Sequence, residues 1–96
     1  MEMIRGFADK ETENLWNRKR STALPQNLQR NALRKLLQIH AAEDLEDLRV
    51  PPGNRLEKLS GDRQGQHSIR VNVQWRVCFE WEDGDAHEVE IVDYHK

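Results

Sequence analysis

Hydrophobic and polar residues alternate strictly between Ser68 and Glu82. Alternation with a period of two is typical of a strand that buries one face. The run is longer than a usual strand, so we expect a hairpin with its loop at residues 72–74. That register sets Arg70 opposite Arg76, and both side chains point away from the apolar face. The residues of the expected apolar face are Ile69, Val71, Val73, Trp75, Val77, Phe79 and Trp81.

The two facing arginines need an explanation, because like charges directly opposite each other destabilise a sheet. One explanation is that an anion normally sits between or near Arg70 and Arg76. The other is that Glu80, on the same face, neutralises one of them, since exposed charges often pair on a sheet. The sequence leaves both open.

The first half of the chain has a helical period. Asp9 is expected to cap a helix that runs through Trp16, and Pro25 to stand in the first turn of a second helix. In the second helix, apolar residues recur at spacings of three and four and predict a buried face. This stripe comprises Leu28, Ala32, Leu36 and Ile39, widened by Leu33 and Leu37.

Three further elements complete the expected fold. Residues 45–48 either extend the second helix or make one further turn before Pro51 ends it. Residues 3–7 are expected to form a first strand, and residues 86–94 a last strand after the turn at Asp83-Gly84. We therefore expect a single α+β domain over residues 1–96, with two N-terminal helices packed on a small, mainly antiparallel sheet.

Composition limits the function classes. The 96 residues are 36% hydrophobic and 33% charged, with one cysteine, Cys78, so an internal disulfide is impossible. Neither a signal peptide nor a membrane-spanning run is present, and we expect a cytoplasmic protein without a membrane partner. The net charge of −2 hides segregation: residues 18–35 carry bases and no acid, and residues 77–92 carry acids and no base. Such blocks either create a cationic side for a polyanion or are simply solvated.

The residues with useful chemistry are Arg76, Tyr94 and His95. Metal-free RNA cleavage requires a proton acceptor, a cation for the phosphate and a proton donor, and these side chains have those properties. A histidine next to the end of the sequence can equally be a frayed residue. His67 and His87 lack further ligands at zinc-like spacing, so no metal site is expected. Residues 61–65 predict a turn that carries one exposed arginine, Arg63.

A known family accounts for the second half of the chain. The run from Arg55 to Asn72 (RLEKLSGDRQGQHSIRVN), the run from Gln74 to Phe79 (QWRVCF) and the ending Asp93-Tyr94-His95 resemble HigB-type toxins of the RelE-like superfamily. The resemblance implies an α+β fold and a toxin that cuts mRNA in the ribosomal A site. It also implies silencing by a HigA-type helix-turn-helix antitoxin, through which alone operator DNA would be bound.

The resemblance also implies roles for individual residues. Arg76 takes the place of the family's phosphate-binding arginine, and no cofactor is expected. In related systems the basic helix surface can meet 16S ribosomal RNA, and the sequence leaves open what these residues do here. The catalytic group would be completed by Asp93, Tyr94 and His95, and the RNA-binding residues would be Arg70, Asn72, Lys58 and Arg63.

The chain departs from some family members just before the Gly-Asp-Arg turn. They have a histidine and a lysine where this sequence has Glu57 and Ser60. Lys58 is expected to restore some positive charge, whereas Glu57 would repel a phosphate, so we expect weak or ribosome-dependent cleavage. The alternative is a non-enzymatic toxin of the same fold that inhibits a protein such as gyrase. A DNA-binding regulator acting alone is disfavoured, because no helix-turn-helix pattern is visible.

Overall fold

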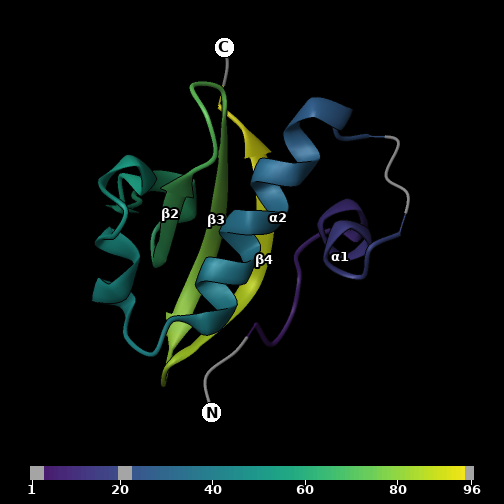
Figure 1. The fold of residues 1–96 in the computed structure, drawn as a ribbon. Helices are drawn as coiled ribbons and strands as arrows, with labels where there is room; N and C mark the ends of the chain where they lie inside the picture. Colours follow the sequence, from purple (N-terminus) through teal and green to yellow (C-terminus); the bar gives the residue numbers. More distant parts are fainter. Residues whose placement is uncertain (1–3, 20–22, 95–96) are drawn as a thin grey trace.

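The computed structural model describes residues 4–19 and 23–94, in which two α-helices pack on a four-stranded antiparallel sheet (Figure 1). The expected α+β architecture is confirmed. Within these two ranges, no helix is both long and apolar enough to cross a membrane. The strands lie side by side in chain order: β1 (Glu57–Lys58), β2 (Gln66–Arg70), β3 (Trp75–Glu82) and β4 (Asp85–Asp93).

Helix α1 (Lys10–Trp16) begins after Asp9, as the sequence predicts. The Asp9 carboxylate accepts a hydrogen bond from the backbone N–H of Thr12 at 3.3 Å, which satisfies one donor of the first turn. The Thr12 hydroxyl in turn accepts a bond from the N–H of Ile91 at 3.0 Å. This bond joins α1 to β4, and the ring of Trp16 in α1 lies 5.0 Å from the ring of His40 in α2.

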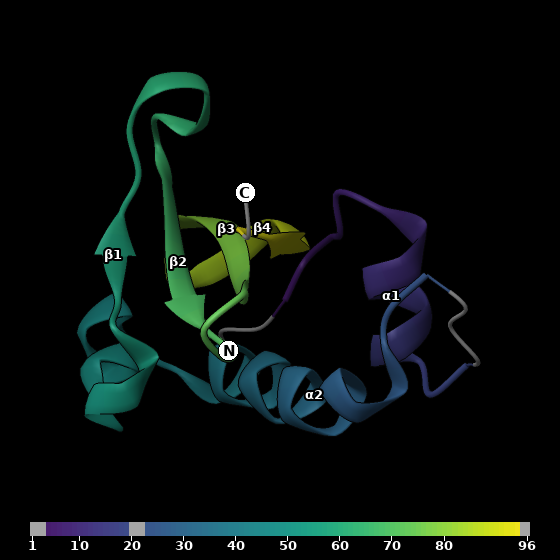
Figure 2. The same cartoon turned by 90° about the horizontal axis from the view of Figure 1, so that it is seen from above.

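Helix α2 (Gln26–Ala41) lies along the apolar side of the sheet (Figure 2). Its predicted stripe is largely confirmed, but Leu37 is 43% exposed and does not widen it. Pro25 is the residue before the helix rather than part of its first turn. The hydrophobic core joins the stripe to sheet residues, and its central members are Leu28, Ala32, Leu36, Ile39, Ile69, Val77, Phe79 and Val89.

After α2 the chain makes two short 3-10 helices, η1 (Leu45–Arg49) and η2 (Pro52–Asn54). Of the two expectations for residues 45–48, the separate turn is correct. Ala42 is extended and ends α2, and Asp44 caps η1 with its side chain. A third short helix, η3 (Gly61–Arg63), connects β1 to β2.

The predicted hairpin is confirmed in its register. Arg70 pairs with Arg76, and the N–H of Val71 donates to the carbonyl of Trp75 at 2.9 Å. The Asn72 side-chain oxygen accepts bonds from the N–H groups of Gln74 and Trp75, both at 2.8 Å, and so closes the loop.

The turn between β3 and β4 also follows the sequence prediction. Asp83 and Gly84 have φ values of 55° and 83°. A two-residue hairpin turn of this kind matches the twist of the flanking strands.

The expected first strand is wrong. Ile4 and Phe7 make isolated parallel bridges to Ala86 and Val89, and the described residues between them form no strand. Glu88 lies between the two partners on β4 and has a left-handed φ of 53°, which interrupts the regular pleat. A continuous ladder therefore cannot form there.

Candidate active site

Arg76 stands at the start of β3 on the face of the sheet opposite the helices. Its guanidinium is nearly enclosed, with a side chain only 13% exposed. The Nε group donates to the hydroxyl of Ser68 at 2.7 Å, and Nη2 donates to the carbonyl of Arg55 at 2.6 Å. These two bonds hold the guanidinium in one orientation, as a site that binds a phosphate requires.

The Arg55 carbonyl reaches Arg76 because the backbone at Arg55 is left-handed, with φ 46° and ψ 57°. Asn54, just before it, is fully buried and anchors η2 to the helical layer. Its side-chain amide donates to Gln38 at 3.0 Å and to the carbonyl of Leu48 at 3.1 Å, and it accepts from Lys35 Nζ at 2.5 Å. Burial, together with neighbouring Arg34, lowers the pKa of Lys35.

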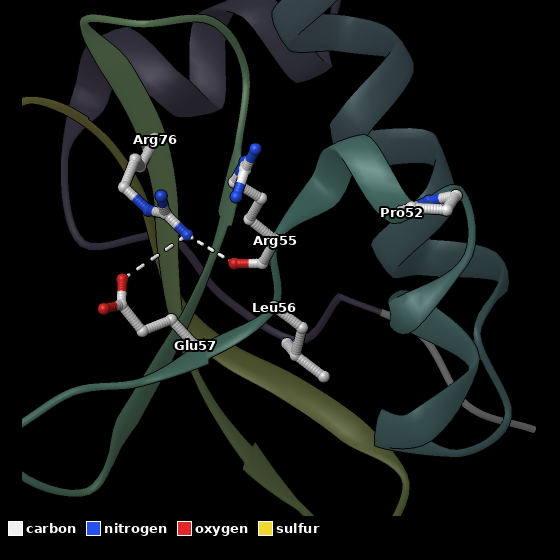
Figure 3. A pocket seen from close by; sticks show the side chains of 5 residues that line it. All are labelled: Pro52, Arg55, Leu56, Glu57 and Arg76. Carbon is white, nitrogen blue, oxygen red and sulfur yellow. Dashed lines mark hydrogen bonds and ion pairs between the residues drawn. The ribbon is translucent and has the colours of Figure 1, made fainter.

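A pocket of about 480 Å³ opens beside Arg76, and its lining residues are Pro52, Arg55, Leu56, Glu57 and Arg76. Figure 3 shows the guanidinium of Arg76 between the Arg55 carbonyl and the Glu57 carboxylate. The carboxylate lies 3.6 Å from Nη2, and the Glu57 side chain is 58% exposed. Two arginines and one glutamate thus line the pocket.

The structure places an acid beside one member of the arginine pair. Glu57 is the acid found beside Arg76, so the expectation that Glu80 plays this part is wrong. Glu80 is exposed and pairs in register with Gln66 and His87, farther along β3. An additional anion between the arginines stays a prediction.

Tyr94 lies on the other side of Arg76, with the guanidinium carbon 5.9 Å from the ring centre. The backbone N–H of Tyr94 donates to the carbonyl of Gln74 at 2.6 Å, which fixes the residue to the hairpin. Its hydroxyl lies 3.7 Å from Cys78 Sγ. Burial and this contact raise the pKa of Tyr94 to about 12, so the hydroxyl keeps its proton at neutral pH. Burial also raises the pKa of the Cys78 thiol.

A second pocket, of about 290 Å³, is lined by Arg63, Val92, Asp93 and Tyr94. The expectation that Arg63 is simply exposed is wrong. Its guanidinium donates to Glu90 at 3.2 Å and to Gln66 at 3.0 Å. Asp93 accepts a bond from the side chain of Gln74 at 3.2 Å. Arg63 is therefore held at the edge of the surface that Tyr94 and Asp93 form.

The structure brings some of the expected site residues together and separates others. Arg76, Tyr94, Asp93 and Arg63 converge, and Arg70 is the cross-strand neighbour of Arg76. Asn72 shapes the hairpin loop, and the guanidinium of Arg70 donates to its carbonyl at 3.1 Å. His95 lies outside the described residues.

Lys58 is not brought to this site. It pairs with His67, whereas Glu57 pairs with Ser68, so Lys58 and Glu57 point to opposite faces of the sheet. Lys58 consequently does not offset the charge of Glu57 beside Arg76.

Sequence reasoning missed the role of Arg55 and the pairing of Glu57 with Arg76. The cluster Pro51-Pro52-Gly53-Asn54 predicts the end of the helical segment, but it does not predict the direction in which the backbone continues. Within the described part of the chain, no group of three or more His, Cys, Asp or Glu side chains could hold a metal ion.

Comparison with known proteins assigns the chain to a family. The family model for the RelE-like toxin HigB of type II toxin-antitoxin systems matches residues 5–95. The chain belongs to the HigB-like toxin family. The RelE-like α+β fold expected from the resemblance is thereby confirmed, and a HigB toxin of a type II system implies an antitoxin partner.

Two curated HigB relatives illustrate the similarity. The chain is 44% identical over 81 residues to Toxin HigB-1 of Vibrio cholerae, a match that covers 83% of this chain and 85% of the relative. It is 44% identical over 41 residues to Endoribonuclease HigB of Proteus vulgaris, covering 43% of this chain and 45% of that protein. The resemblance in the sequence rested on the second half of the chain. The family match covers both halves.

Proposed function

We propose that this HigB-type toxin is an endoribonuclease that cleaves mRNA on the ribosome, with the ribose 2′-OH as the nucleophile. The observation that supports the proposal is the oriented, nearly enclosed guanidinium of Arg76 between a pocket and the ring of Tyr94. A planar fork of donors suits a phosphate, and an aromatic ring suits a base. DNA of the same sequence lacks the nucleophile and should stay intact.

Each site residue has a role in this reaction. Arg76 stabilises the pentacoordinate phosphate, and Tyr94 stacks on a base with its hydroxyl protonated. Asp93 accepts a hydrogen bond from the Gln74 side chain and holds the residues beside it in position. His95 is proposed to move a proton, since imidazole does so near neutral pH. The proposed reaction uses no metal and no cofactor.

The partners follow from the same proposal. A HigA-type helix-turn-helix antitoxin would neutralise the toxin and repress the operon, so that operator DNA is bound only through it. The mRNA would reach Arg76 in the ribosomal A site, with 16S ribosomal RNA meeting the basic helix surface around Arg30 and Arg34, both exposed. Ribosomes place this activity in the cytoplasm.

The deciding experiment is translation of a defined mRNA on purified ribosomes, with new 5′ ends mapped. Wild-type protein should produce cuts, and Arg76→Ala should lower the rate about 10²- to 10³-fold, as loss of a transition-state donor does. His95→Ala should also lower it. Arg49→Ala is a matched control, because Arg49 is exposed on η1 and pairs with Glu46.

Complete translation of uncut mRNA in the presence of folded wild-type protein would contradict the proposal. That outcome would favour a non-enzymatic toxin of the same fold, which inhibits a protein target instead.

A further inference from the structure

We infer that the side chain of Arg55 binds a second phosphate of the RNA backbone, next to the phosphate that Arg76 holds. The inference rests on the proposed ribonuclease function and adds a binding residue to its site. It also assigns to Arg55 the compensating positive charge that the sequence predicts for Lys58.

Arg55 is the second arginine of the pocket beside Arg76. The pocket has a volume of about 480 Å³, within the range of small-ligand sites. Arg55 is exposed, and Figure 3 shows its side chain extending away from the Glu57 carboxylate. Within residues 4–19 and 23–94, no hydrogen bond or ion pair engages its guanidinium, whereas the guanidinium of Arg76 bonds to Ser68 and to the Arg55 carbonyl. The donors of the Arg55 side chain are therefore available to a ligand.

The charges around Arg76 call for a second cation. The Glu57 carboxylate lies 3.6 Å from Nη2 of Arg76, and this pair has no net charge. A phosphate that meets only a neutral pair gains little Coulombic attraction. Lys58 points to the opposite face of the sheet and contributes nothing here. Among the described residues that line the pocket, Arg55 supplies the net positive charge.

The backbone at Arg55 is a further reason. Its φ of 46° and ψ of 57° are left-handed, a conformation that glycine or asparagine adopts at lower cost. Buried Asn54 holds this turn through its bonds to Gln38 and Leu48, and the turn directs the Arg55 carbonyl to Arg76 at 2.6 Å. Strained backbone is found where a site uses it. Arg55 thus orients Arg76 with its carbonyl and offers its own side chain to the ligand.

A backbone phosphate is the ligand that fits this side chain. A guanidinium binds phosphate through two parallel hydrogen bonds, in a planar fork of donors. Consecutive phosphates in RNA are joined through a single ribose. A strand with its scissile phosphate at Arg76 therefore brings a neighbouring phosphate towards the same pocket. Two phosphate contacts fix the position of the strand better than one does.

The test measures kcat and KM in the ribosome-dependent cleavage assay for wild type, Arg55→Asn and Arg55→Lys. Asparagine tolerates the left-handed backbone, so the carbonyl that orients Arg76 is kept while the guanidinium is removed. Arg55→Asn should raise KM about tenfold, at the low end for a hydrogen bond to a charged group because Arg55 is exposed. Its kcat should stay within about threefold of wild type, as expected for loss of uniform binding. Arg55→Lys should recover part of the affinity, since the charge remains without the fork.

A modified mRNA identifies the contact. One linkage beside the scissile phosphate, first on the 5′ side and then on the 3′ side, is made an uncharged methylphosphonate. The ribose of that linkage carries a 2′-O-methyl group, and the same 2′-O-methyl mRNA with an ordinary phosphate is the reference substrate. On one of the two sides, the methylphosphonate should raise the KM of wild type about tenfold and leave the KM of Arg55→Asn unchanged, because the contact is already lost.

Arg18→Asn is the matched control. Arg18 is also an exposed arginine with a left-handed φ, of 62°, and it lies outside the pocket. Its KM should equal that of wild type with both kinds of mRNA. Circular dichroism and urea unfolding check that each variant is folded.

Several results would overturn the inference. If folded Arg55→Asn keeps the wild-type KM, its side chain holds no phosphate. If it loses kcat with an unchanged KM, Arg55 acts only through the carbonyl that orients Arg76. If the methylphosphonate affects wild type and Arg55→Asn equally on both sides, the phosphate contact lies elsewhere. If wild-type protein cuts no RNA at all, the proposed function itself fails, and the inference falls with it.

Discussion

The guanidinium of Arg76 lies over the ring of Tyr94, with 5.9 Å between the guanidinium carbon and the ring centre. The two residues meet because β3 and β4 are antiparallel, with Trp75 opposite Asp93. The start of β3 and the end of β4 therefore share one edge of the sheet. The proposed phosphate-binding residue and the proposed base-stacking residue are thus set side by side by the strand register.

We expect Tyr94→Ala to weaken RNA binding by about 1–3 kcal/mol, or roughly 5- to 150-fold, because a stacking surface is lost. Tyr94→Phe should retain most of the affinity, since the ring remains and only the contact to Cys78 disappears. Fluorescence anisotropy with a labelled RNA and the folded variants measures both. Equal loss in the two variants would show that the hydroxyl, rather than the ring, binds RNA.

Arg63 should contribute more to RNA binding than to folding. Its ion pair with Glu90 is partly exposed, and such pairs contribute about 0–1 kcal/mol to stability. We expect Arg63→Ala to unfold in urea nearly as wild type does, while the slope of log affinity against log salt falls by about one. An unchanged salt slope would remove Arg63 from the RNA-binding surface.

The buried pair of Asn54 and Lys35 predicts a large effect on stability. Asn54→Ala leaves a buried ammonium without its amide partner, so we expect a loss of about 2–3 kcal/mol. The double variant Asn54→Leu with Lys35→Met should lose less, because both polar partners are then removed. Asn27→Ala, at an exposed position on α2, should stay within about 0.5 kcal/mol of wild type.

Urea unfolding measures the free energy of unfolding for each of these variants. If the double variant is less stable than Asn54→Ala, the Asn54–Lys35 pair adds to the free energy of unfolding, and its two polar groups do more than satisfy each other.

His67 should make the fold less stable in mild acid. Its Nδ1 is buried and has no hydrogen-bond partner among the described residues, and burial, with nearby Lys58, lowers its pKa below 6.5. The unfolded chain therefore takes up the proton first as the pH falls. As the pH is lowered, the free energy of unfolding should begin to fall at about pH 6.5, and the decrease caused by His67 should be complete below the native pKa of this residue. Above about pH 6.5, His67 should not change the free energy of unfolding.

Urea unfolding at about pH 7.5 and about pH 5 compares wild type with His67→Leu. The leucine variant should lose less stability between the two values. An equal loss in both proteins would assign the acid sensitivity to the carboxylates alone.

Much of the fold could be read from local pattern. The alternation over residues 68–82 predicts the hairpin and the facing of Arg70 and Arg76, because side chains in a strand point to alternate faces. Asp9 marks the start of α1, because its side chain accepts a hydrogen bond from the first turn of the helix. Asp83-Gly84 marks the turn between β3 and β4, because both residues adopt the positive φ that this turn requires. The resemblance of the second half led to the family that the comparison shows.

The tertiary structure decided what surrounds Arg76. A local pattern states which way a side chain points, but not which distant segment lies above it. The Arg55 carbonyl and the Glu57 carboxylate reach Arg76 because buried Asn54 holds the preceding turn to α2 and β1 joins the edge of β2. Arg63 likewise meets Glu90 only once η3 and β4 have packed together. The sequence by itself determined the two helices, the hairpin and the position of Arg76 on it, and long-range packing determined the charges that Arg76 meets.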